Sequence, residues 1–274
     1  MLKYIPAFLL SLSIVAVAQK DSTLLPVLPT ESIIEQSEKD TLNFVKDSLA
    51  NEMDTIDAVF PEGLTARDVI NKYVEVIGGA DKIYNIVDRT TIMRGSVQGI
   101  NITIVSYQKA PNKLKQQIKA GANEQLIIFN GEKGIMKMAG EKQEIPAAEL
   151  EKLKFEATIT LLTDPEYHGI KLSLEGIEKV ENKDSYKVIM TLPSGIKWTQ
   201  FYDIATGLKL KEEKYINSPM GLFRQEIIYD DYKEVEGLLY PFKIKQKIGT
   251  QNMEFNVSSV KINSGLADRE FEIE

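Results

Sequence analysis

The side chains best suited to chemistry gather in one short stretch, Asp164-Pro165-Glu166-Tyr167-His168. Two carboxylates and the only histidine of the chain lie close enough together to ligate a metal ion or exchange a proton. The proline predicts a turn, however, and the i, i+2, i+4 spacing is not the helical or strand arrangement of metal motifs. We therefore interpret this stretch as a surface turn with no catalytic or metal-binding role.

The residue types missing from the chain narrow the chemistry further. The 274 residues include no cysteine and one histidine. This excludes thiol nucleophiles, disulfide bonds, thiolate zinc sites and every motif that needs two histidines. No G-x-S-x-G stretch marks a nucleophilic serine either. We therefore predict that the protein is not an enzyme and needs neither a cofactor nor a metal ion.

Composition and charge exclude other classes of protein. Hydrophobic residues make up 43% of the chain and charged residues 27%, as in a globular protein with a core of its own. The 33 basic residues are outnumbered by 40 acidic ones, which gives a net charge of -7. A protein that holds nucleic-acid phosphates needs an excess of basic residues. We therefore expect no nucleic-acid partner.

The N-terminus has the pattern of a cleavable signal peptide. Lys3 precedes an apolar run over residues 5–17, and Ala16-Val17-Ala18 is the small-x-small pattern after which signal peptidase cuts. We predict a signal peptide over residues 1–18, with cleavage after Ala18 and export from the cytoplasm. No later stretch holds the roughly 18 apolar residues that a transmembrane helix needs.

Residues 19–63 differ in character from the rest of the chain. They contain ten acidic and three basic residues, with prolines at positions 26, 29 and 61 and no sustained apolar period. Such a composition favours an extended tether over a packed core. We predict an acidic flexible linker over residues 19–63, followed by one domain over residues 64–274.

A helix is expected directly after the linker. Thr65-Ala66-Arg67-Asp68 has the form of a capping box, in which the threonine hydroxyl and the acidic side chain satisfy amides of the first turn. Gly78-Gly79 is expected to end this helix. Proline at the start and apolar residues at three- and four-residue spacing predict a second helix within residues 146–162, and residues 81–87 predict a short helical piece. The first helix carries one apolar stripe, made of Val69, Ile70, Tyr73, Val74 and Ile77.

The rest of the chain alternates between apolar and polar residues with a period of two, which predicts antiparallel strands. Near Ser258-Ser259 the period slips, which predicts a β-bulge. A long sheet with one apolar face must curl, so we predict a mainly β (α+β) fold. Its curved antiparallel sheet forms an incomplete β-barrel of about 9–11 strands, closed by two or three short helices. The expected strands cover residues 100–104, 114–119, 125–129, 134–138, 170–174, 185–192, 196–202, 208–215, 222–229, 240–248 and 253–257.

Four short patches carry a resemblance to a known family. They are the amphipathic helix ending in Ile77-Gly78-Gly79, the corner Ala110-Pro111-Asn112, the hairpin Asn130-Gly131-Glu132-Lys133, and the closing stretch Leu266-Ala267-Asp268-Arg269-Glu270-Phe271. In these patches and in the order of its elements, the chain resembles the LolA/LolB-like family of outer-membrane lipoprotein-sorting proteins. The resemblance covers residues 65–273.

The resemblance implies a half-barrel whose apolar hollow shelters lipoprotein acyl chains, or another lipid, in the aqueous periplasm. Each methylene exposed to water costs about 0.8 kcal/mol, so acyl chains cross water only inside a carrier. We therefore expect a monomeric, non-catalytic, periplasmic lipid carrier. The candidate lining residues are apolar side chains on the inward faces of the strands and of the helical lid: Ile102, Ile104, Met136, Met138, Leu150, Leu153, Tyr186, Val188, Met190, Trp198, Phe242 and Ile244.

A second function is open from the same residues. A half-barrel can instead hold a partner protein of a cell-envelope complex or a processing protease, with no lipid cargo, and the acidic segment 19–63 favours this interpretation. The best-known members of the family carry a basic residue before the Pro-Asn corner that helps to latch the lid. This chain has Ala110 there, with Lys109 one residue earlier. An open apolar cavity favours the carrier, and an interior filled by bulky side chains favours the interaction domain.

Overall fold

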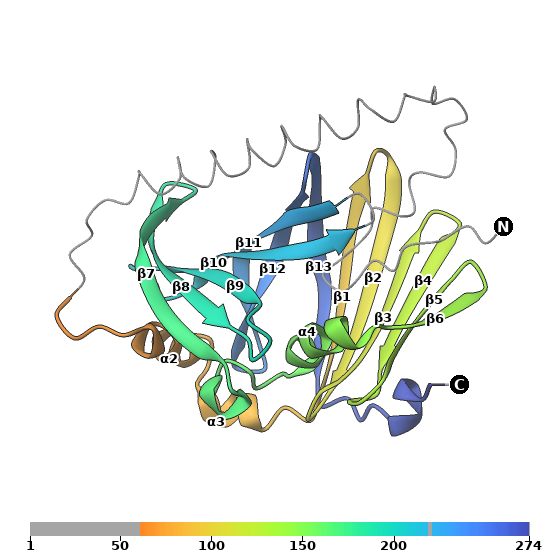
Figure 1. Ribbon diagram of the computed structural model, residues 1–274, viewed down its shortest axis with the longest axis horizontal. Coiled ribbons are helices and arrows are strands. Elements are labelled where there is room, and N and C mark those ends of the chain that lie inside the picture. The colour runs from red at the N-terminus through yellow and green to blue at the C-terminus, as the bar shows by residue number, and fades with distance from the viewer. Residues whose placement is uncertain (1–60, 219–220, 274) are drawn as a thin grey trace.

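The computed structural model describes residues 61–218 and 221–273 (Figure 1). The predicted signal peptide and the predicted linker up to residue 60 lie outside the described residues. No helix in the described ranges is both long enough and apolar enough to cross a membrane.

Short helices begin where the sequence predicts them. The capping box at Thr65 is confirmed, because its hydroxyl accepts from the Asp68 amide at 3.2 Å while the Asp68 carboxylate accepts from the Thr65 amide at 2.9 Å. Pro146 stands at the N-cap of the second predicted helix. The helices of the described chain are α2 (Ala66–Val76), α3 (Ala80–Tyr84) and α4 (Ala147–Ala157), with short 3-10 turns η3 (Glu166–His168) and η4 (Asp268–Phe271).

One antiparallel sheet of 13 strands contains every strand of the described ranges, in the order β6-β5-β4-β3-β2-β1-β13-β12-β11-β10-β9-β8-β7. Strands that follow one another in sequence pair with each other within β1–β6 and within β7–β13, and β1 pairs with β13 in the middle of the sheet, where Arg89 lies opposite Ile262. The strands are β1 (Asp88–Val97), β2 (Ile100–Lys109), β3 (Lys113–Ala120), β4 (Asn123–Phe129), β5 (Gly134–Met138), β6 (Glu141–Glu144), β7 (Lys171–Val180), β8 (Lys183–Thr191), β9 (Lys197–Asp203), β10 (Lys209–Ser218), β11 (Gly221–Val235), β12 (Leu238–Ile248) and β13 (Gln251–Ile262).

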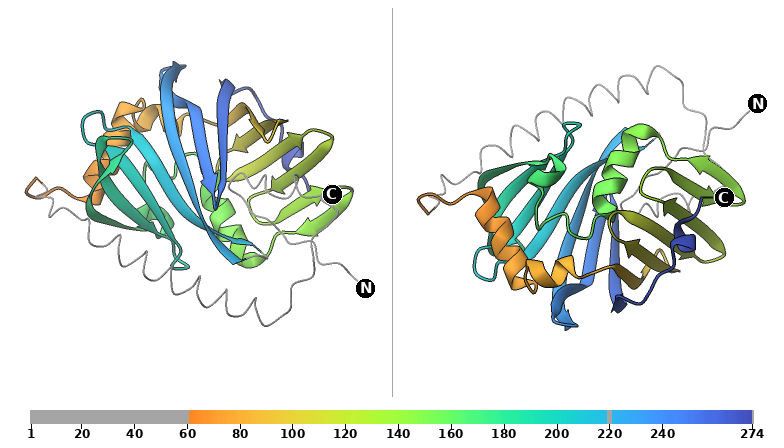
Figure 2. Two further views of the ribbon diagram at one scale, coloured as in Figure 1. Left: turned by 90° about the horizontal axis from the view of Figure 1, so that it is seen from above. Right: turned by 90° about the horizontal axis from the view of Figure 1, so that it is seen from below.

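The predicted architecture is confirmed, although there are more strands than predicted. The sheet curves without closing, because β6 and β7 stand at its two free edges (Figure 2). The two strands without a predicted counterpart are β1 and β6. Strand β6 has the sequence Glu-Lys-Gln-Glu and no apolar residue, so it shows no alternation to detect. In β1, only Ile92, Met93 and Val97 are large and apolar, and they do not alternate.

One face of the sheet is concave and carries the helices (Figure 2). The side chain of Ile104 lies on this face in register with Met93 on β1 and Ile118 on β3. Helix α2 packs there against Val188 and Tyr202, near one edge. Helix α4 packs on the same face near the other edge, where Leu153 meets Leu114, Phe129 and Met136. The helices therefore cover the two flanks of the concave face.

The predicted β-bulge is confirmed. Ile92 pairs with Ser259 and Met93 with Val257, so Ser258 is the extra residue of a β-bulge in β13. In the turn that joins β8 to β9, Gly195 adopts a φ of 89°, which a residue without a side chain reaches at no steric cost.

The residues after β13 are tied back onto β1 and β2. The Asp88 carboxylate, in a residue only 2% exposed, accepts hydrogen bonds from the amides of residues 264–266 at 2.8–3.1 Å. Burial acts to raise the pKa of this carboxyl, but the hydrogen bonds outweigh it and the pKa is lowered. The Lys109 ammonium donates to the Leu266 carbonyl at 2.8 Å and lies 3.1 Å from Asp268. Lys109 thus fastens this segment to the sheet.

Candidate functional site

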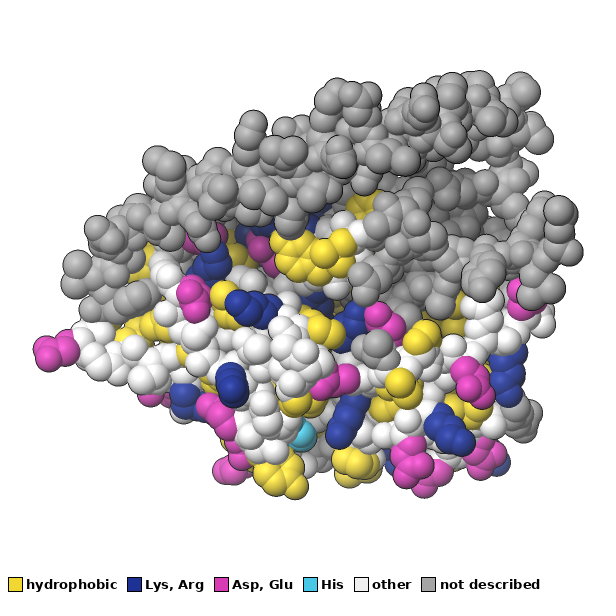
Figure 3. Space-filling view, in the orientation of Figure 1, with side chains coloured by type: hydrophobic (Ala, Val, Ile, Leu, Met, Phe, Trp, Pro, Cys, Tyr) yellow, Lys and Arg dark blue, Asp and Glu magenta, His cyan; other side chains and the backbone are white. Residues whose placement is uncertain are grey.

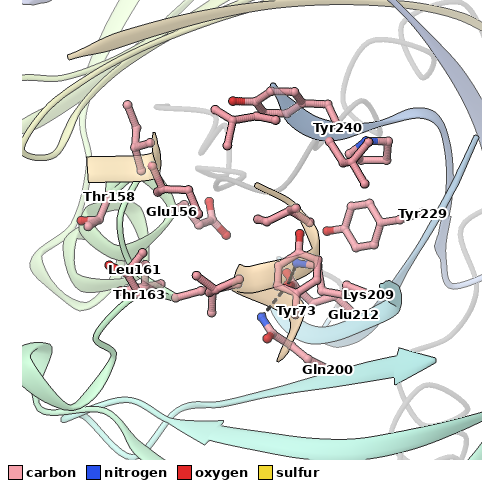
Figure 4. Close-up of a pocket in the computed structure, with 18 of the residues that line it drawn as sticks. Tyr73, Glu156, Thr158, Leu161, Thr163, Gln200, Lys209, Glu212, Tyr229 and Tyr240 are labelled. Atoms are coloured by element: carbon pink, nitrogen blue, oxygen red, sulfur yellow. Dashed lines mark hydrogen bonds and ion pairs between the residues drawn. The ribbon is translucent and has the colours of Figure 1, made fainter. Parts of the chain in front are cut away.

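A cavity of about 350 Å³ lies between the concave face of the sheet and the helices (Figure 4). It is bounded by α2, α3, the end of α4 and the segment that follows, and by strands β1 and β9–β12. This volume is at the lower end of the range for small-molecule sites, which is about 300–1,000 Å³. The cavity is the candidate functional site of the described chain.

Part of the lining is apolar, and we call this part the apolar wall. It follows from the stripe on α2, since Tyr73, Val74 and Ile77 recur at three- and four-residue spacing and all face inward. The segment after α4 contributes further apolar side chains to it. The apolar wall consists of Val74, Ile77, Ile83, Ile86, Ile159, Leu161, Leu162, Leu238 and Leu239.

The remaining lining contains a buried group of charges, Glu156, Lys209, Glu212 and Lys214, which we call the charged cluster. The Glu212 carboxylate lies 3.0 Å from the Lys209 ammonium and 2.7 Å from that of Lys214. Lys214 also lies 3.1 Å from the carboxylate of Glu156, which reaches into the cluster from the end of α4. The side chains are between 6% and 17% exposed, so water screens these interactions little.

The pKa values of the two carboxyl groups in the charged cluster are shifted in opposite directions. Burial acts to raise the pKa of Glu212, but Lys209 and Lys214 outweigh it and lower the pKa to about 2. Burial raises the pKa of Glu156, and the negative charge of Glu212 adds to this, while Lys214 only partly compensates. Burial acts to lower the pKa of Lys214, but the two carboxylates raise it. Lys214 therefore stays charged, and Glu156 is the carboxyl of the cluster that protonates most readily.

Aromatic and amide side chains surround the charged cluster. The Lys214 ammonium lies 4.0 Å from the ring centre of Trp198, and the Lys209 ammonium 4.6 Å from that of Tyr229. Gln200 donates to Glu212 at 2.9 Å and accepts from the hydroxyl of Tyr202. In Figure 4, Tyr229 points from β11 toward the open centre of the cavity. The cavity therefore combines the apolar wall with a polar part.

Arg89 lines the cavity from β1. Its Nε and Nη2 donate to the Gln108 side-chain oxygen at 3.0 and 2.5 Å, and Gln108 in turn donates to the Glu156 carbonyl at 2.9 Å. The guanidinium lies 5.5 Å from the ring centre of Tyr240. These contacts hold Arg89 in one orientation.

The structure places the predicted strand residues on the concave face. Val188 lies opposite Gln200 and Met190 opposite Trp198, while Ile104 and Ile244 continue the same face in the central strands. Of the predicted lining residues, Trp198 lines the cavity described here. Contact of the whole set with a ligand remains a prediction. The other predicted residues lie elsewhere on this face or on α4: Ile102, Ile104, Phe242 and Ile244 in the central apolar cluster, Met136, Leu150 and Leu153 beneath α4, Tyr186 and Val188 beneath α2, Met190 beside Trp198, and Met138 at the end of β5.

Sequence reasoning missed the charged cluster. Strand β10 begins Lys-Leu-Lys-Glu-Glu-Lys, and charges at almost every position indicate a solvated strand. The signal that could have been used lies in the neighbouring strand, where Gln200 stands between Trp198 and Tyr202 on the inner face. A polar residue buried in that face needs a polar partner on the next strand, and Glu212 provides it.

The carboxylate–histidine stretch singled out in the sequence forms η3, outside the cavity lining. Arg67 from α2 donates to Glu166 at 3.1 Å and lies 3.8 Å from Asp164, so the carboxylates are engaged in ion pairs. The His168 ring contacts Phe155 edge-on. Among the described residues, no group of three or more acidic or histidine side chains is placed to hold a metal ion.

No protein-family model matches the chain, and no curated protein matches it in sequence. Solved structures match it in fold. A DUF1329 family protein from Desulfovibrio piger aligns with a TM-score of 0.50 and 13% identity, over 76% of this chain and 97% of that one. A candidate outer membrane lipoprotein-sorting protein domain from Vibrio parahaemolyticus aligns with a TM-score of 0.50 and 12% identity, over 75% and 95%. A LolA superfamily protein from Nitrosomonas europaea aligns with a TM-score of 0.50 and 15% identity, over 77% and 99%.

The described chain thus belongs to the class of open, curved antiparallel sheets with helices on the concave face. Within that class its fold is LolA-like. The likeness extends over three quarters of this chain and nearly all of each matched chain.

Proposed function

We propose that the protein is an exported, non-catalytic binding protein of the bacterial envelope that shelters a lipid or a lipoprotein acyl chain. The observation that carries this proposal is the cavity of about 350 Å³ between the sheet and its helices, with the apolar wall on one side. The predicted signal peptide of residues 1–18 supports a periplasmic location. The LolA-like fold supports it too, since one solved structure with this fold carries the description of a lipoprotein-sorting domain.

The energetics of the apolar wall support an acyl chain as ligand. Transfer of each methylene from water into an apolar site is worth about 0.8 kcal/mol, so a chain of ten methylenes gains about 8 kcal/mol before the costs of ordering. A rigid polar ligand gains nothing from Ile77, Leu161 or Leu162. An acyl chain is flexible enough to follow the wall between α2 and the segment after α4.

The test is native mass spectrometry of the exported chain purified without detergent, combined with organic extraction of the purified protein. We expect co-purified lipid or acylated peptide. The Ile159→Trp variant, which places a large side chain in the cavity wall, is expected to lose it. The matched control is Leu222→Trp, at a side chain 59% exposed and outside the cavity lining, which is expected to keep it.

A clean protein mass, together with no uptake of a fluorescent fatty acid by the folded chain, would contradict the proposal. Equal lipid content in the two tryptophan variants would also contradict it, because the lipid would then be bound elsewhere. Pull-down of an envelope protein through residues 19–63 is the next experiment in either case.

A further inference from the structure

The charged side chains of the cavity do not balance. Its lining holds three cations, Arg89, Lys209 and Lys214, and two carboxylates, Glu156 and Glu212. Both lysines lie within 3.1 Å of a carboxylate. No ion pair joins Arg89 to a carboxylate within the described ranges. The cavity therefore has one positive charge in excess, located at Arg89.

Arg89 is also pre-oriented. Gln108 accepts from two of its nitrogens and is itself fixed by the carbonyl of Glu156, and Tyr240 lies against the guanidinium. Within the described chain, Nη1 of Arg89 makes no hydrogen bond. A guanidinium held by one edge with another edge unoccupied suits an acceptor with paired oxygens, because carboxylates and phosphates match its planar fork.

A second donor in the same lining also lacks an acceptor. Trp198 is 3% exposed, and its indole Nε1–H has no hydrogen-bond partner in the described chain. An unmade hydrogen bond at a buried donor costs about 1–3 kcal/mol. Two unmatched donors, one of them charged, in a lining whose carboxylates are all paired indicate that the missing component is an acceptor with negative charge.

Resting on the function proposed above, we propose that the cavity takes a single-chain anionic amphiphile. Its carboxylate or phosphate binds Arg89, and its one acyl chain lies along the apolar wall. The volume of about 350 Å³ suits one chain, near the lower limit for small-molecule sites. A headgroup with no charge leaves Arg89 without a counter-ion.

Three probes with the same 14-carbon chain test this proposal: myristate, myristyl phosphate and myristyl alcohol. Binding to the purified full chain is measured by isothermal titration calorimetry below the critical micelle concentration. We expect the anionic probes to bind at least about tenfold more tightly than the alcohol, as a hydrogen-bonded ion pair predicts. The ratio between carboxylate and phosphate then tells which headgroup is preferred.

Variants at Arg89 assign the effect to this side chain. Arg89→Gln keeps hydrogen-bonding capacity and removes the charge, so we expect it to lose about tenfold in affinity for the anionic probes and to leave the alcohol unchanged. Arg89→Lys is expected to recover part of the loss. The matched control is Arg94→Gln, on the same strand but exposed and on the outer face of the sheet, which is expected to change neither affinity.

Equal binding of all three probes by the unaltered chain would overturn this inference and leave the proposed function standing. Equal weakening of alcohol and anion by Arg89→Gln would overturn it as well. Binding of none of the probes would overturn both. The comparison of probes on the unaltered chain needs no variant, so it decides the matter even if Arg89→Gln fails to fold.

Discussion

Two regions of the same concave face are built in opposite ways. In the middle of the sheet, Ile102, Ile104, Ile118 and Phe255 form a dry cluster, and each is at most 2% exposed. Toward β9 and β10, the same face carries the charged cluster. The described surface visible in Figure 3, by contrast, mixes charges of both signs with scattered apolar side chains.

The difference separates what the fold needs from what a site needs. Burial of the central cluster drives the sheet to curl and pack, at about 25 cal/mol for each Å² of apolar surface. The charged cluster contributes little of this kind, since buried ion pairs often only offset the cost of removing their charges from water. A region that is costly to bury and rich in oriented donors is expected where a ligand binds.

The largest effect is expected from breaking the charged cluster at its centre. Glu212→Ala leaves Lys209 and Lys214 without their shared carboxylate, so we expect the free energy of unfolding to fall by about 3–5 kcal/mol. Urea denaturation followed by circular dichroism measures this. The control is Glu254→Ala, which removes the ion pair between Lys243 and Glu254, a side chain that is 50% exposed. A fall in the free energy of unfolding of more than about 1 kcal/mol in this control would contradict the distinction between buried and surface ion pairs.

The effect of Glu212→Ala on the free energy of unfolding is expected to depend on pH. The pKa of Glu212 lies at about 2 in the folded chain, below its ordinary value of 4.5. Its contribution to stability is therefore complete above pH 4.5 and is lost as the pH falls toward 2. The gap in unfolding free energy between the unaltered chain and Glu212→Ala is expected to shrink over this range. A gap that stays constant contradicts the lowered pKa.

The central apolar cluster gives the next largest effect. Ile104 is 0% exposed. We expect Ile104→Ala to lower the free energy of unfolding by about 2–4 kcal/mol, because apolar burial is lost and a cavity is left behind. Thermal and urea denaturation at pH 4 and pH 8 measure the cost, and we expect it to be the same at both values because no charge is involved. A cost that changes with pH shows that the two regions are coupled.

A variant in which the charged cluster is made apolar, like the central cluster, is expected to change stability in the opposite direction. Replacing the charged cluster together, as Glu156→Leu, Lys209→Met, Glu212→Leu and Lys214→Met, is expected to leave stability unchanged or raise it by about 1–4 kcal/mol. Differential scanning calorimetry gives the stability. A strong loss of stability in this variant would show that the fold itself depends on the charged cluster.

The smallest effect is expected at the edge of the charged cluster. Glu156→Gln removes one of the two carboxylate partners of Lys214. We therefore expect the free energy of unfolding to change by about 1 kcal/mol at neutral pH. Because the folded pKa of Glu156 is raised above 4.5, the folded state holds its proton more tightly than the unfolded state does. The unaltered chain should therefore lose stability relative to this variant as the pH rises above 4.5. A change in the opposite direction contradicts the raised pKa.

Local pattern predicted much of the fold. The capping box at Thr65, the bulge at Ser258 and the inward face of β12 each follow from residue type and spacing within one element. Strand β6 could not be predicted in this way, because its four polar residues are held by pairing with β5 and carry no period of their own.

The polar part of the cavity could not be predicted from local sequence pattern, for a different reason. The inward direction of Glu212 depends on the register that sets it opposite Gln200 on one side and Ile227 on the other. Arg89 becomes a cavity residue only through Gln108 and the end of α4, which lies far away in sequence. Buried charge is a property of the assembled sheet, so periodicity indicates the apolar wall and misses the charged cluster.

The pairing of β1 with β13 also sets the order in which the molecule can be assembled. Each half of the sheet is a run of hairpins between sequence neighbours, which form early because their contacts are local. The seam between the halves joins residues 89–96 to residues 254–262, so it cannot close until β13 is available to pair. Until then β1 keeps an unpaired edge, which another chain can occupy. The interval between formation of the hairpins around β1 and the pairing of β1 with β13 is therefore the period in which the protein most needs to be kept apart from its own copies.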